Sequence, residues 1–441
     1  MRSSTAPRIF FFTLGCPKNE VDSDRMKAAV LASAYELADE PNNADVVVVN
    51  TCSFIQDATE ESISAVLDFA GEWVPASEGR KLVVAGCLPS RYGDDLTESM
   101  PEVDAFVPVA EEAQLLEVLE RLVGTRATAA KAPQSPNVLR TRPGPSAYLQ
   151  ISDGCHRRCS FCTIPTIRGP YRSRALAEIE EEARRLVAGG AREIILIGQD
   201  ISSYGRDITG HSGSRPVLSD VVLAVARIDG LNWLRLMYVQ PDGVTDELLR
   251  VMATEPTVCH YLDLPLQHAS RSVLGRMGRR GSAEEYLALI ARIRDAIPDI
   301  VLRTSLISGF PGETRADVRA LEDFLAEARI DYAGVFAYSP EEGTPAATLP
   351  DMPTRSTRIR RANRLREIAD AIGFEKAAER IGDQLEVLVE GVDEDGTIVG
   401  RWRGQAPEVD GLVLLDNGIP GEFVRARVVD TLGYDLEAEV F

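Results

Sequence analysis

Three cysteines are packed into one short segment near the middle of the 441-residue chain. Cys155, Cys159 and Cys162 have the spacing C-x3-C-x2-C, and an aromatic residue precedes the last of them. A loop of this length can place three thiolates around one iron–sulfur cube. Because such cubes are ordinarily held by four cysteines, one iron would be left to an exchangeable ligand. The spacing therefore predicts a cluster that performs chemistry at an open iron.

A zinc site is the other interpretation of these thiols. Structural zinc normally has four protein ligands in paired motifs, and the segment offers only His156, directly beside Cys155, as a fourth. That position is poorly suited to complete a tetrahedron. Zinc is disfavoured for this reason, and simple electron transfer is disfavoured because a fourth thiolate is missing.

Three further cysteines, Cys16, Cys52 and Cys87, each stand just after a short apolar run and before a helix-like stretch. The runs are Arg8 to Leu14, Asp45 to Asn50 and Lys81 to Ala85. Strands that alternate with helices predict a parallel sheet, and ligands of such sheets gather at the carboxyl ends of the strands. A second site with three thiolates is the prediction. The alternative is three small buried residues at strand ends, since free cysteine is often buried.

A second α/β region follows, and we expect it to be an open partial (β/α)6 barrel. Its predicted strands are Tyr148 to Ser152, Glu193 to Gly198, Trp233 to Tyr238, His260 to Pro265, Val301 to Ile307 and Tyr332 to Tyr338. Helical patterns such as Leu176 to Ala188, Glu284 to Ile297 and Ala316 to Ala328 lie between them. The triple-cysteine loop follows the first strand, at the rim where barrel enzymes build their active sites.

In the C-terminal part the helical patterns stop, and short strand patterns are separated by Gly and Asp. We expect a small all-β barrel there. The fold class is α/β, in four parts: an N-terminal parallel domain over 1–125, a Pro-rich basic linker over 126–146, the partial barrel over 147–373 and the β domain over 374–441. Cys259 has no other thiol near it in the sequence, and we expect it in the core.

Charge and composition narrow the function classes. The net charge of −20 opposes nonspecific binding to phosphate backbones and favours a basic partner. No run approaches the roughly 18 apolar residues of a membrane span, and the N-terminal apolar run is too short for a secretory signal. With an odd number of cysteines, seven, metal ligands or buried thiols are favoured over disulfides. We expect a cytoplasmic protein.

Nearly the whole chain resembles the methylthiotransferases of the radical S-adenosylmethionine (SAM) superfamily. The resemblance includes the triple-cysteine loop, Arg168-Gly169, Gly198-Gln199-Asp200, Gly309 to Glu313 and Tyr338 to Pro345. Leu14 to Asn19 and Val21 to Ser23 resemble the branch that modifies an aspartate of small-subunit ribosomal protein twelve (RimO). The tRNA-modifying branch (MiaB) usually reads Gly-Cys-Gln-Met-Asn there. Asp24 and Gln150 depart from the residues usual in the family. Neither is an expected cluster ligand, so the departures bear on the expected substrate and not on the expected chemistry.

The resemblance implies two 4Fe-4S clusters, one on Cys155, Cys159 and Cys162 that binds SAM, and an auxiliary one on Cys16, Cys52 and Cys87. It also implies a C-terminal domain of the TRAM type, a low-potential electron donor and a sulfur source. Gly309, Gly312 and Glu313 follow one predicted strand, and Gly198 and Gln199 lie at the end of another. We expect both turns near SAM, although ordinary turn chemistry also explains them. His268 is a possible site residue or a structural histidine.

The expected reaction adds a methylthio group to the β-carbon of that aspartate. TRAM domains generally bind RNA, so a tRNA adenosine methylthiotransferase is the alternative. Residues 382–441 hold fourteen acidic residues and four arginines, which disfavours RNA and favours a basic ribosomal protein. A noncatalytic iron–sulfur carrier is the rival from another class. The six arginines between Arg355 and Arg366 are interpreted as a solvated helix face.

Overall fold

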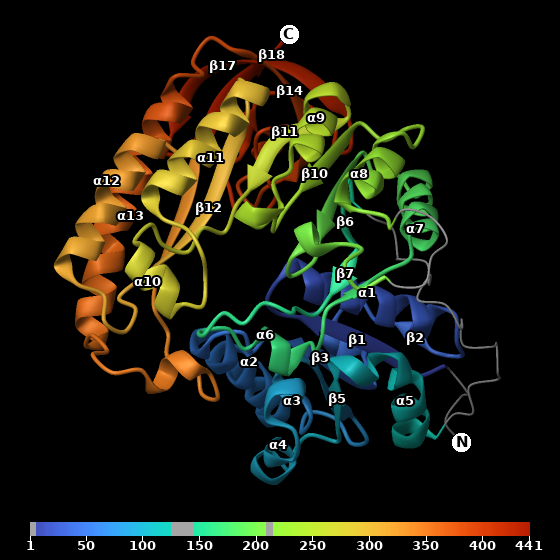
Figure 1. Ribbon diagram of the computed structural model, residues 1–441. Coiled ribbons are helices and arrows are strands. Elements are labelled where there is room, and N and C mark those ends of the chain that lie inside the picture. Colours follow the sequence, from blue (N-terminus) through green and yellow to red (C-terminus); the bar gives the residue numbers. More distant parts are fainter. Residues whose placement is uncertain (1–5, 125–143, 209–214) are drawn as a thin grey trace. The chain divides into compact units, whose positions relative to one another are not determined.

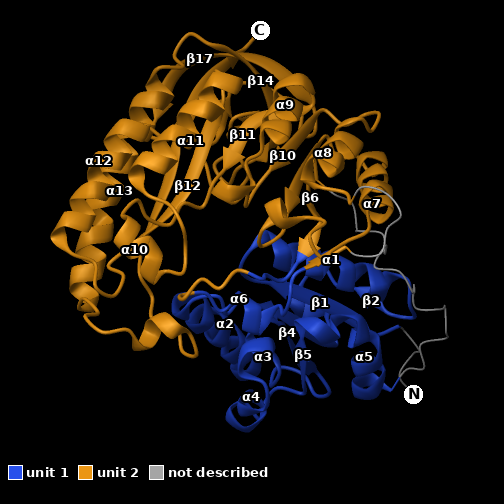
Figure 2. Ribbon diagram, in the orientation of Figure 1, with its two compact units in different colours: residues 1–142, 153–156, 162–171 blue, residues 143–152, 157–161, 172–441 orange. Residues whose placement is uncertain are grey.

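The computed structural model describes residues 6–124, 144–208 and 215–441. Most of the predicted linker, from 126 to 143, lies outside these residues. The chain divides into two compact units (Figure 2). The first contains residues 1–142, 153–156 and 162–171, and the second contains 143–152, 157–161 and 172–441.

The first unit is built on a five-stranded parallel sheet in the order β2-β1-β3-β4-β5 (Figure 1). The strands are β1 (Arg8–Thr13), β2 (Glu36–Leu37), β3 (Val46–Thr51), β4 (Lys81–Gly86) and β5 (Ala105–Pro108). Every residue of β3 is buried, as expected for a central strand covered on both faces. The three predicted strands are confirmed. β2 and β5 were not predicted, because each is too short to give a hydrophobic pattern.

Helices cover this sheet and follow its strands. They are α1 (Pro17–Leu31), α2 (Gln56–Asp68), α3 (Cys87–Tyr92), α4 (Asp94–Ser99) and α5 (Leu115–Val123), with a π-helical turn at Phe69–Trp73. The alternating side chains of the strands separate into two hydrophobic cores, one containing Val46 and Val48 and the other Val47 and Val49. This alternation is the two-residue period of a strand.

The second unit contains six parallel strands in an open sheet, in the order β13-β12-β11-β10-β9-β6. They are β6 (Ser146–Gln150), β9 (Glu193–Ile197), β10 (Trp233–Leu236), β11 (Val258–Asp263), β12 (Val301–Ser308) and β13 (Tyr332–Ala337). The expected partial barrel of six β/α units is thereby confirmed. Cys259 on β11 is completely buried, as predicted.

Helices of nine to 24 residues pack on the outer side of this sheet (Figure 1). They are α7 (Leu176–Ala188), α8 (Leu218–Ala226), α9 (Asp246–Thr254), α11 (Ala283–Ala296), α12 (Arg315–Ala328) and α13 (Arg355–Ala378), with the short α10 (Arg271–Arg276) before α11. Short elements flank the cysteine loop: β7 (Ser152–Asp153), α6 (Ile164–Ile167) and β8 (Arg172–Ser173). The arginine-rich stretch forms α13, and its Arg361 and Arg364 pair with Glu313 and Glu322.

The C-terminal residues form a closed five-stranded barrel in the order β14-β15-β16-β18-β17. Its strands are β14 (Gln384–Val392), β15 (Ile398–Trp402), β16 (Val413–Leu415), β17 (Phe423–Leu432) and β18 (Asp435–Val440). The predicted small all-β barrel is confirmed. Closure leaves no unpaired strand edge.

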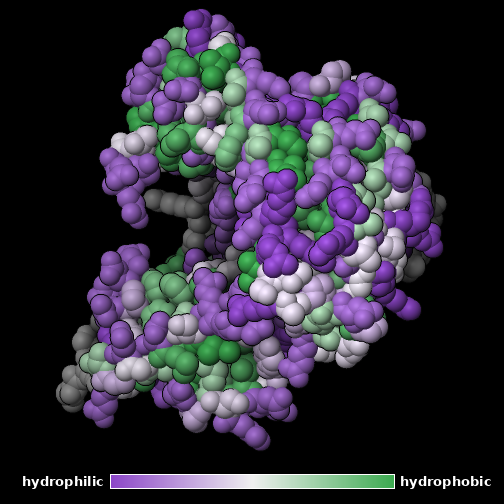
Figure 3. Space-filling view, turned by 90° about the vertical axis from the view of Figure 1, so that its left-hand side faces the viewer, coloured by the Kyte–Doolittle hydropathy of each residue, from purple (hydrophilic) through white to green (hydrophobic). Residues whose placement is uncertain are grey.

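Hydrophilic side chains dominate the face drawn in Figure 3. In the described part of the chain, none of the helices is both long enough and apolar enough to cross a membrane.

Candidate iron–sulfur and SAM site

The three N-terminal cysteines occupy equivalent places in the first unit. Cys16 is the N-cap of α1, Cys52 directly follows β3, and Cys87 is the first residue of α3 after β4. β1, β3 and β4 are neighbours in the sheet, so the three thiols lie at one edge, at the carboxyl ends of adjacent strands. The strand-end argument predicted this arrangement.

Asn19 joins these cysteines. Its Oδ1 lies 4.0 Å from the sulfur of Cys16 and 3.7 Å from that of Cys87, which limits the separation of the two sulfurs to the sum of these distances. The third thiol, that of Cys52, lies beside Gly15, the residue before Cys16, because a Cβ on Gly15 would be 3.0 Å from the Cys52 sulfur. Gly15 has φ of 98°, a conformation that suits glycine. The three sulfurs therefore gather around one small region, which fits a cluster held by three thiolates.

The Asn19 amide is itself held in place. Its Nδ2 donates to the carbonyl oxygens of Leu14 and Thr51, both at 2.9 Å, and the side chain is fully buried. The amide thus bridges the ends of β1 and β3. Sequence reasoning had assigned Asn19 to the family motif only.

A buried arginine supplies positive charge beside these thiols. Arg168 Nη2 donates to Asn19 Oδ1 at 2.9 Å and to Asp22 Oδ2 at 2.8 Å, and its side chain is 1% exposed. Burial works against the Arg168 charge, but Asp22 and Asp153 raise its pKa above the usual value. Burial raises the pKa of Cys87 to about 12, and Arg168 opposes this rise. Without a bound metal the Cys87 thiol stays protonated, so binding would release its proton.

The second set of thiols lies in the loop between β7 and α6, within residues 155–162. Glycine sets the entry of the loop: Gly154 has φ of 69°, and a Cβ there would lie 2.3 Å from the Pro170 carbonyl oxygen. Cys155 N donates to the Gly169 carbonyl at 3.2 Å. At the exit, the Thr163 hydroxyl donates to the Phe54 carbonyl at 3.1 Å, two residues after Cys52. Within the first unit, the exit of this loop therefore contacts the segment that carries Cys52.

His156 is engaged with its neighbours rather than with the thiols. Its Nδ1 accepts a hydrogen bond from Tyr171 N at 3.4 Å, and the two rings pack at a tilted angle. Among the described residues, no group of three or more His, Cys, Asp or Glu side chains is arranged to hold a single metal ion. A single ion needs thiolates about 2.3 Å away, whereas a four-iron cube accepts more widely spaced sulfurs.

In the second unit, the turn after β9 holds the middle of the cysteine loop. Asp200 accepts from Arg157 Nε at 2.7 Å, and Asp242 binds the same guanidinium through two hydrogen bonds of 2.7 and 3.2 Å. Gly198 packs against Ser152, since a Cβ on it would lie 2.6 Å from the Ser152 hydroxyl. The predicted Gly198-Gln199-Asp200 motif thus lies against the segments on both sides of Cys155.

The predicted turn at Gly309–Glu313 follows β12 and precedes α12. Glu313 is buried and accepts from Gly309 N and from Arg361 Nη1, both at 2.8 Å. Burial disfavours its charge, but His268, Gly309 and Arg361 together lower its pKa below the usual value. Gly312 is fixed through its carbonyl by Arg276 at 3.0 Å. The Glu313 carboxylate therefore shapes this turn from inside the protein.

His268 is a structural histidine in this arrangement. Its Nδ1 accepts from the backbone N–H groups of Ala269 and Ser270, both at 2.9 Å, so the ring proton resides on Nε2. Nε2 lies 3.4 Å from the Glu313 carboxylate, and neither side chain is exposed. Of the two interpretations of His268, the structural one is supported.

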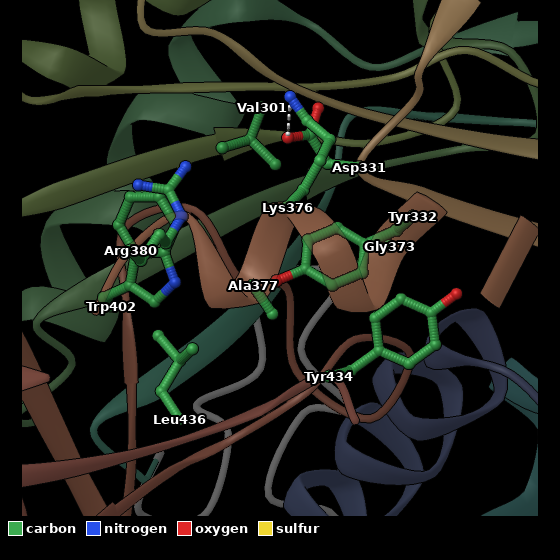
Figure 4. Close-up of a pocket in the computed structure, with 10 residues that line it drawn as sticks. All are labelled: Val301, Asp331, Tyr332, Gly373, Lys376, Ala377, Arg380, Trp402, Tyr434 and Leu436. Carbon is green, nitrogen blue, oxygen red and sulfur yellow. Dashed lines mark ion pairs between the residues drawn. The ribbon is translucent and has the colours of Figure 1, made fainter. Parts of the chain in front are cut away.

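A separate pocket lies between α13 and the C-terminal barrel (Figure 4). Lys376 pairs with Asp331 at 3.0 Å, and the Arg380 guanidinium lies 4.0 Å from the centre of the Trp402 ring. The lining residues include none of the predicted site residues. The pocket is part of the packing between the two sheets of the second unit.

Family models match three successive parts of the chain. The radical SAM superfamily matches residues 149–325, an uncharacterized protein family named UPF0004 matches 8–108, and the TRAM domain matches 381–441. The fold resembles that of the radical SAM methyltransferase TsrM from Kitasatospora setae, with a TM-score of 0.55 over 87% of this chain and 81% of that one, at 16% identity.

Curated relatives match over the full length. The ribosomal protein uS12 methylthiotransferase RimO of Geobacter sulfurreducens is 43% identical, and the alignment covers 99% of both chains. The protein of the same name from Lachnoclostridium phytofermentans is 41% identical, over 97% of this chain and 99% of that one. Identity of this extent across three domains shows common ancestry of the whole architecture, and the chain therefore belongs to the RimO family of radical SAM methylthiotransferases.

Proposed function

We propose that this protein adds a methylthio group to the β-carbon of an aspartate of ribosomal protein uS12. The observation that carries the proposal is the gathering of Cys16, Cys52 and Cys87 around Asn19, because a second three-thiolate site is what sulfur insertion needs beyond a SAM-binding loop. The names of the full-length relatives support the substrate.

In the proposed enzyme, Cys155, Cys159 and Cys162 hold one 4Fe-4S cluster and Cys16, Cys52 and Cys87 hold the other. When bound, the clusters and SAM supply a radical that removes hydrogen from an unactivated carbon, together with the sulfur and the methyl group. The protein contributes position and electrostatics, since the cofactors carry the difficult chemistry. Arg157 and Gly154 fix the SAM-site loop, and Asn19 and Arg168 order the second site.

The proposed SAM contacts are Gly198, Gln199, Gly309, Gly312 and Glu313. Their turns follow β9 and β12, at the carboxyl ends of barrel strands, where barrel enzymes place their ligands. The Glu313 carboxylate is occupied by protein donors, so its contribution would come through the conformation of the Gly309–Gly312 backbone.

The charge of the C-terminal barrel supports a basic protein substrate. Most of its acidic side chains are exposed, among them Asp393, Glu394 and Asp395 in one hairpin, whereas Arg401 is buried in ion pairs. An acidic surface repels nucleic-acid phosphates and attracts basic ribosomal proteins. The cytoplasmic location, the electron donor and the sulfur source stay predictions.

The two cysteine sets are tested separately by substitution. Replacing Cys155, Cys159 and Cys162 by Ala should abolish deoxyadenosine formation from SAM. Replacing Cys16, Cys52 and Cys87 should preserve SAM cleavage and stop methylthio transfer, both measured by mass spectrometry after anaerobic reconstitution. Methylthio product from the second variant at the wild-type level would contradict the assignment.

The substrate is tested by offering the reconstituted enzyme uS12 or tRNA with SAM and a reductant. We expect a mass gain on the uS12 aspartate and none on tRNA. A gain on tRNA alone would favour the adenosine-modifying alternative, and failure to cleave SAM under strong reduction would favour a noncatalytic carrier.

A further inference from the structure

In the second unit, the turn that follows α10 is hydrogen-bonded to the cysteine loop. Ser160 N donates to the Met277 carbonyl at 2.9 Å, and the Ser160 hydroxyl donates to the Arg276 carbonyl at 2.7 Å. Gly278 has φ of 70°, and a Cβ there would lie 2.5 Å from the Arg158 carbonyl oxygen. The turn is therefore fixed in close backbone contact with the residues on either side of Cys159.

Arg279, the next residue, directs its guanidinium at Cys159. Its Nη1 lies 3.7 Å from the Cys159 sulfur, within hydrogen-bond distance for a sulfur acceptor. Its Nη2 donates to Gln240 Oε1 at 2.7 Å and to the Pro265 carbonyl at 2.8 Å. These two acceptors follow β10 and β11, so the end of the side chain is held by the barrel rim while Nη1 faces the thiol.

The charge of Arg279 is not neutralised in the way that of Arg157 is. Arg157 contacts the same loop but forms ion pairs with Asp200 and Asp242. Among the described residues, Arg279 forms no ion pair with a carboxylate, and its acceptors are an amide oxygen, a carbonyl oxygen and a sulfur. Its positive charge is therefore available to the Cys159 sulfur.

We propose that Arg279 is a positioning residue that donates a charged hydrogen bond to the Cys159 thiolate and raises the reduction potential of the cluster held there. The inference rests on the proposed cluster ligands and not on the substrate. Reduction adds one electron from a low-potential donor, and no bond forms or breaks in that step. A fixed positive charge stabilises the more negative reduced state more than the oxidised state, and hydrogen bonds to the sulfurs are an established influence on cluster potentials.

The test uses the full chain with Cys16, Cys52 and Cys87 replaced by Ala, so that the measured signal comes only from the cluster on Cys155, Cys159 and Cys162. Its midpoint potential is measured by anaerobic titration with dithionite, followed by electron paramagnetic resonance. We expect Arg279→Gln to lower the equilibrium constant for reduction about tenfold, equivalent to about 59 mV for one electron. Arg279→Lys should give a smaller shift, because an ammonium keeps the charge but cannot hold all three acceptors.

The matched control is Arg280→Gln, which removes the same charge one residue further along the turn, where the side chain is exposed. Iron content is measured first. If the parent protein binds no cluster, the proposed cofactor assignment fails. If the parent binds a cluster and the midpoint potential of Arg279→Gln equals that of Arg280→Gln, the proposed role of Arg279 is wrong. If Arg279→Gln loses its iron, Arg279→Lys is compared with Arg280→Gln instead, and equal potentials again contradict the role.

Discussion

Asn19 acts at the scale of a single residue. It is an amide placed where two strands end, and it has to satisfy buried carbonyls and approach two thiols at once. Aspartate would bring a further negative charge next to thiolates, and alanine would remove the donor that Asn19 gives to both carbonyls. An amide meets both conditions, since it offers donors and an acceptor without charge.

Replacing Asn19 by Ala should reduce iron binding at the N-terminal thiols. The change leaves the Leu14 and Thr51 carbonyls without their Asn19 donor, which costs about 1–3 kcal/mol for each buried group left unsatisfied. Urea unfolding and iron content are measured with Cys155, Cys159 and Cys162 replaced by Ala. Asn43→Ala, at an exposed position, is the control. Equal iron content in the two variants would contradict the role of Asn19.

At the scale of an element, the cysteine loop is held by its turns. Gly154 and Gly169 face one another across the loop, and both have positive φ, of 69° and 72°. Only Gly154 is crowded: the Pro170 carbonyl oxygen would be 2.3 Å from its Cβ, and Gly169 has nothing within 4 Å of such a position. Alanine at Gly169 would therefore meet only the cost of the left-handed backbone, whereas alanine at Gly154 would meet that cost and a steric overlap as well.

Gly154→Ala should disrupt the loop and abolish cluster binding on Cys155, Cys159 and Cys162. Gly169→Ala should cost only the left-handed conformation, about 1–2 kcal/mol, and should keep its cluster. Iron content and SAM cleavage are the measurements. If both variants kept the cluster equally, the close approach at Gly154 would have no bearing on the site.

At the scale of the whole molecule, the C-terminal barrel is joined to the six-stranded sheet of the second unit by buried charges. Glu193 at the start of β9 binds both Arg235 and Arg401, and none of the three side chains is exposed. Burial opposes the Glu193 charge, but Arg401 and Arg235 lower its pKa to about 2. Tyr261 donates to Asp410 at 2.7 Å in a second buried contact. The barrel is thus an integral part of this unit.

Arg401→Ala should destabilise the second unit by about 3–5 kcal/mol, because it breaks a buried pair and leaves Glu193 with only one of its two arginines, Arg235. Arg425→Ala, which removes an exposed arginine from the same barrel, should change stability by less than about 1 kcal/mol. Urea unfolding measures both. A similar loss for the two variants would show that the buried pair contributes no more than a surface charge.

Asp410 should make stability depend on pH. Burial raises its pKa from 3.8 to about 6, so between these values the folded chain keeps a proton that the unfolded chain has lost. Its stabilising contribution is present below the unfolded pKa and is lost as pH rises through the folded pKa.

Asp410→Asn should therefore gain stability relative to the wild type as pH rises from about 4 to about 7, while the exposed Asp395→Asn should not. Urea unfolding across this range is the measurement. Parallel stability curves for Asp410→Asn and the wild type would contradict the raised pKa.

The local pattern of apolar and polar residues accounts for much of the fold and for the positions of the proposed cluster ligands. Apolar runs alternating with helical stretches predicted both parallel sheets, and the rule that ligands gather at the carboxyl ends of strands predicted that Cys16, Cys52 and Cys87 would share an edge. The short strands β2 and β5 were missed. β2 has two residues, too few for an alternation to show, and its pairing comes from β1.

The sequence by itself determined which residues could bind clusters, because thiol chemistry and short loop spacing are local properties. Only the tertiary structure decided which side chains surround those thiols. Asn19 and Arg168 are 149 residues apart, and Cys159 and Arg279 are 120 apart. Contacts over such distances depend on how whole elements pack, and no spacing rule along the chain encodes that packing.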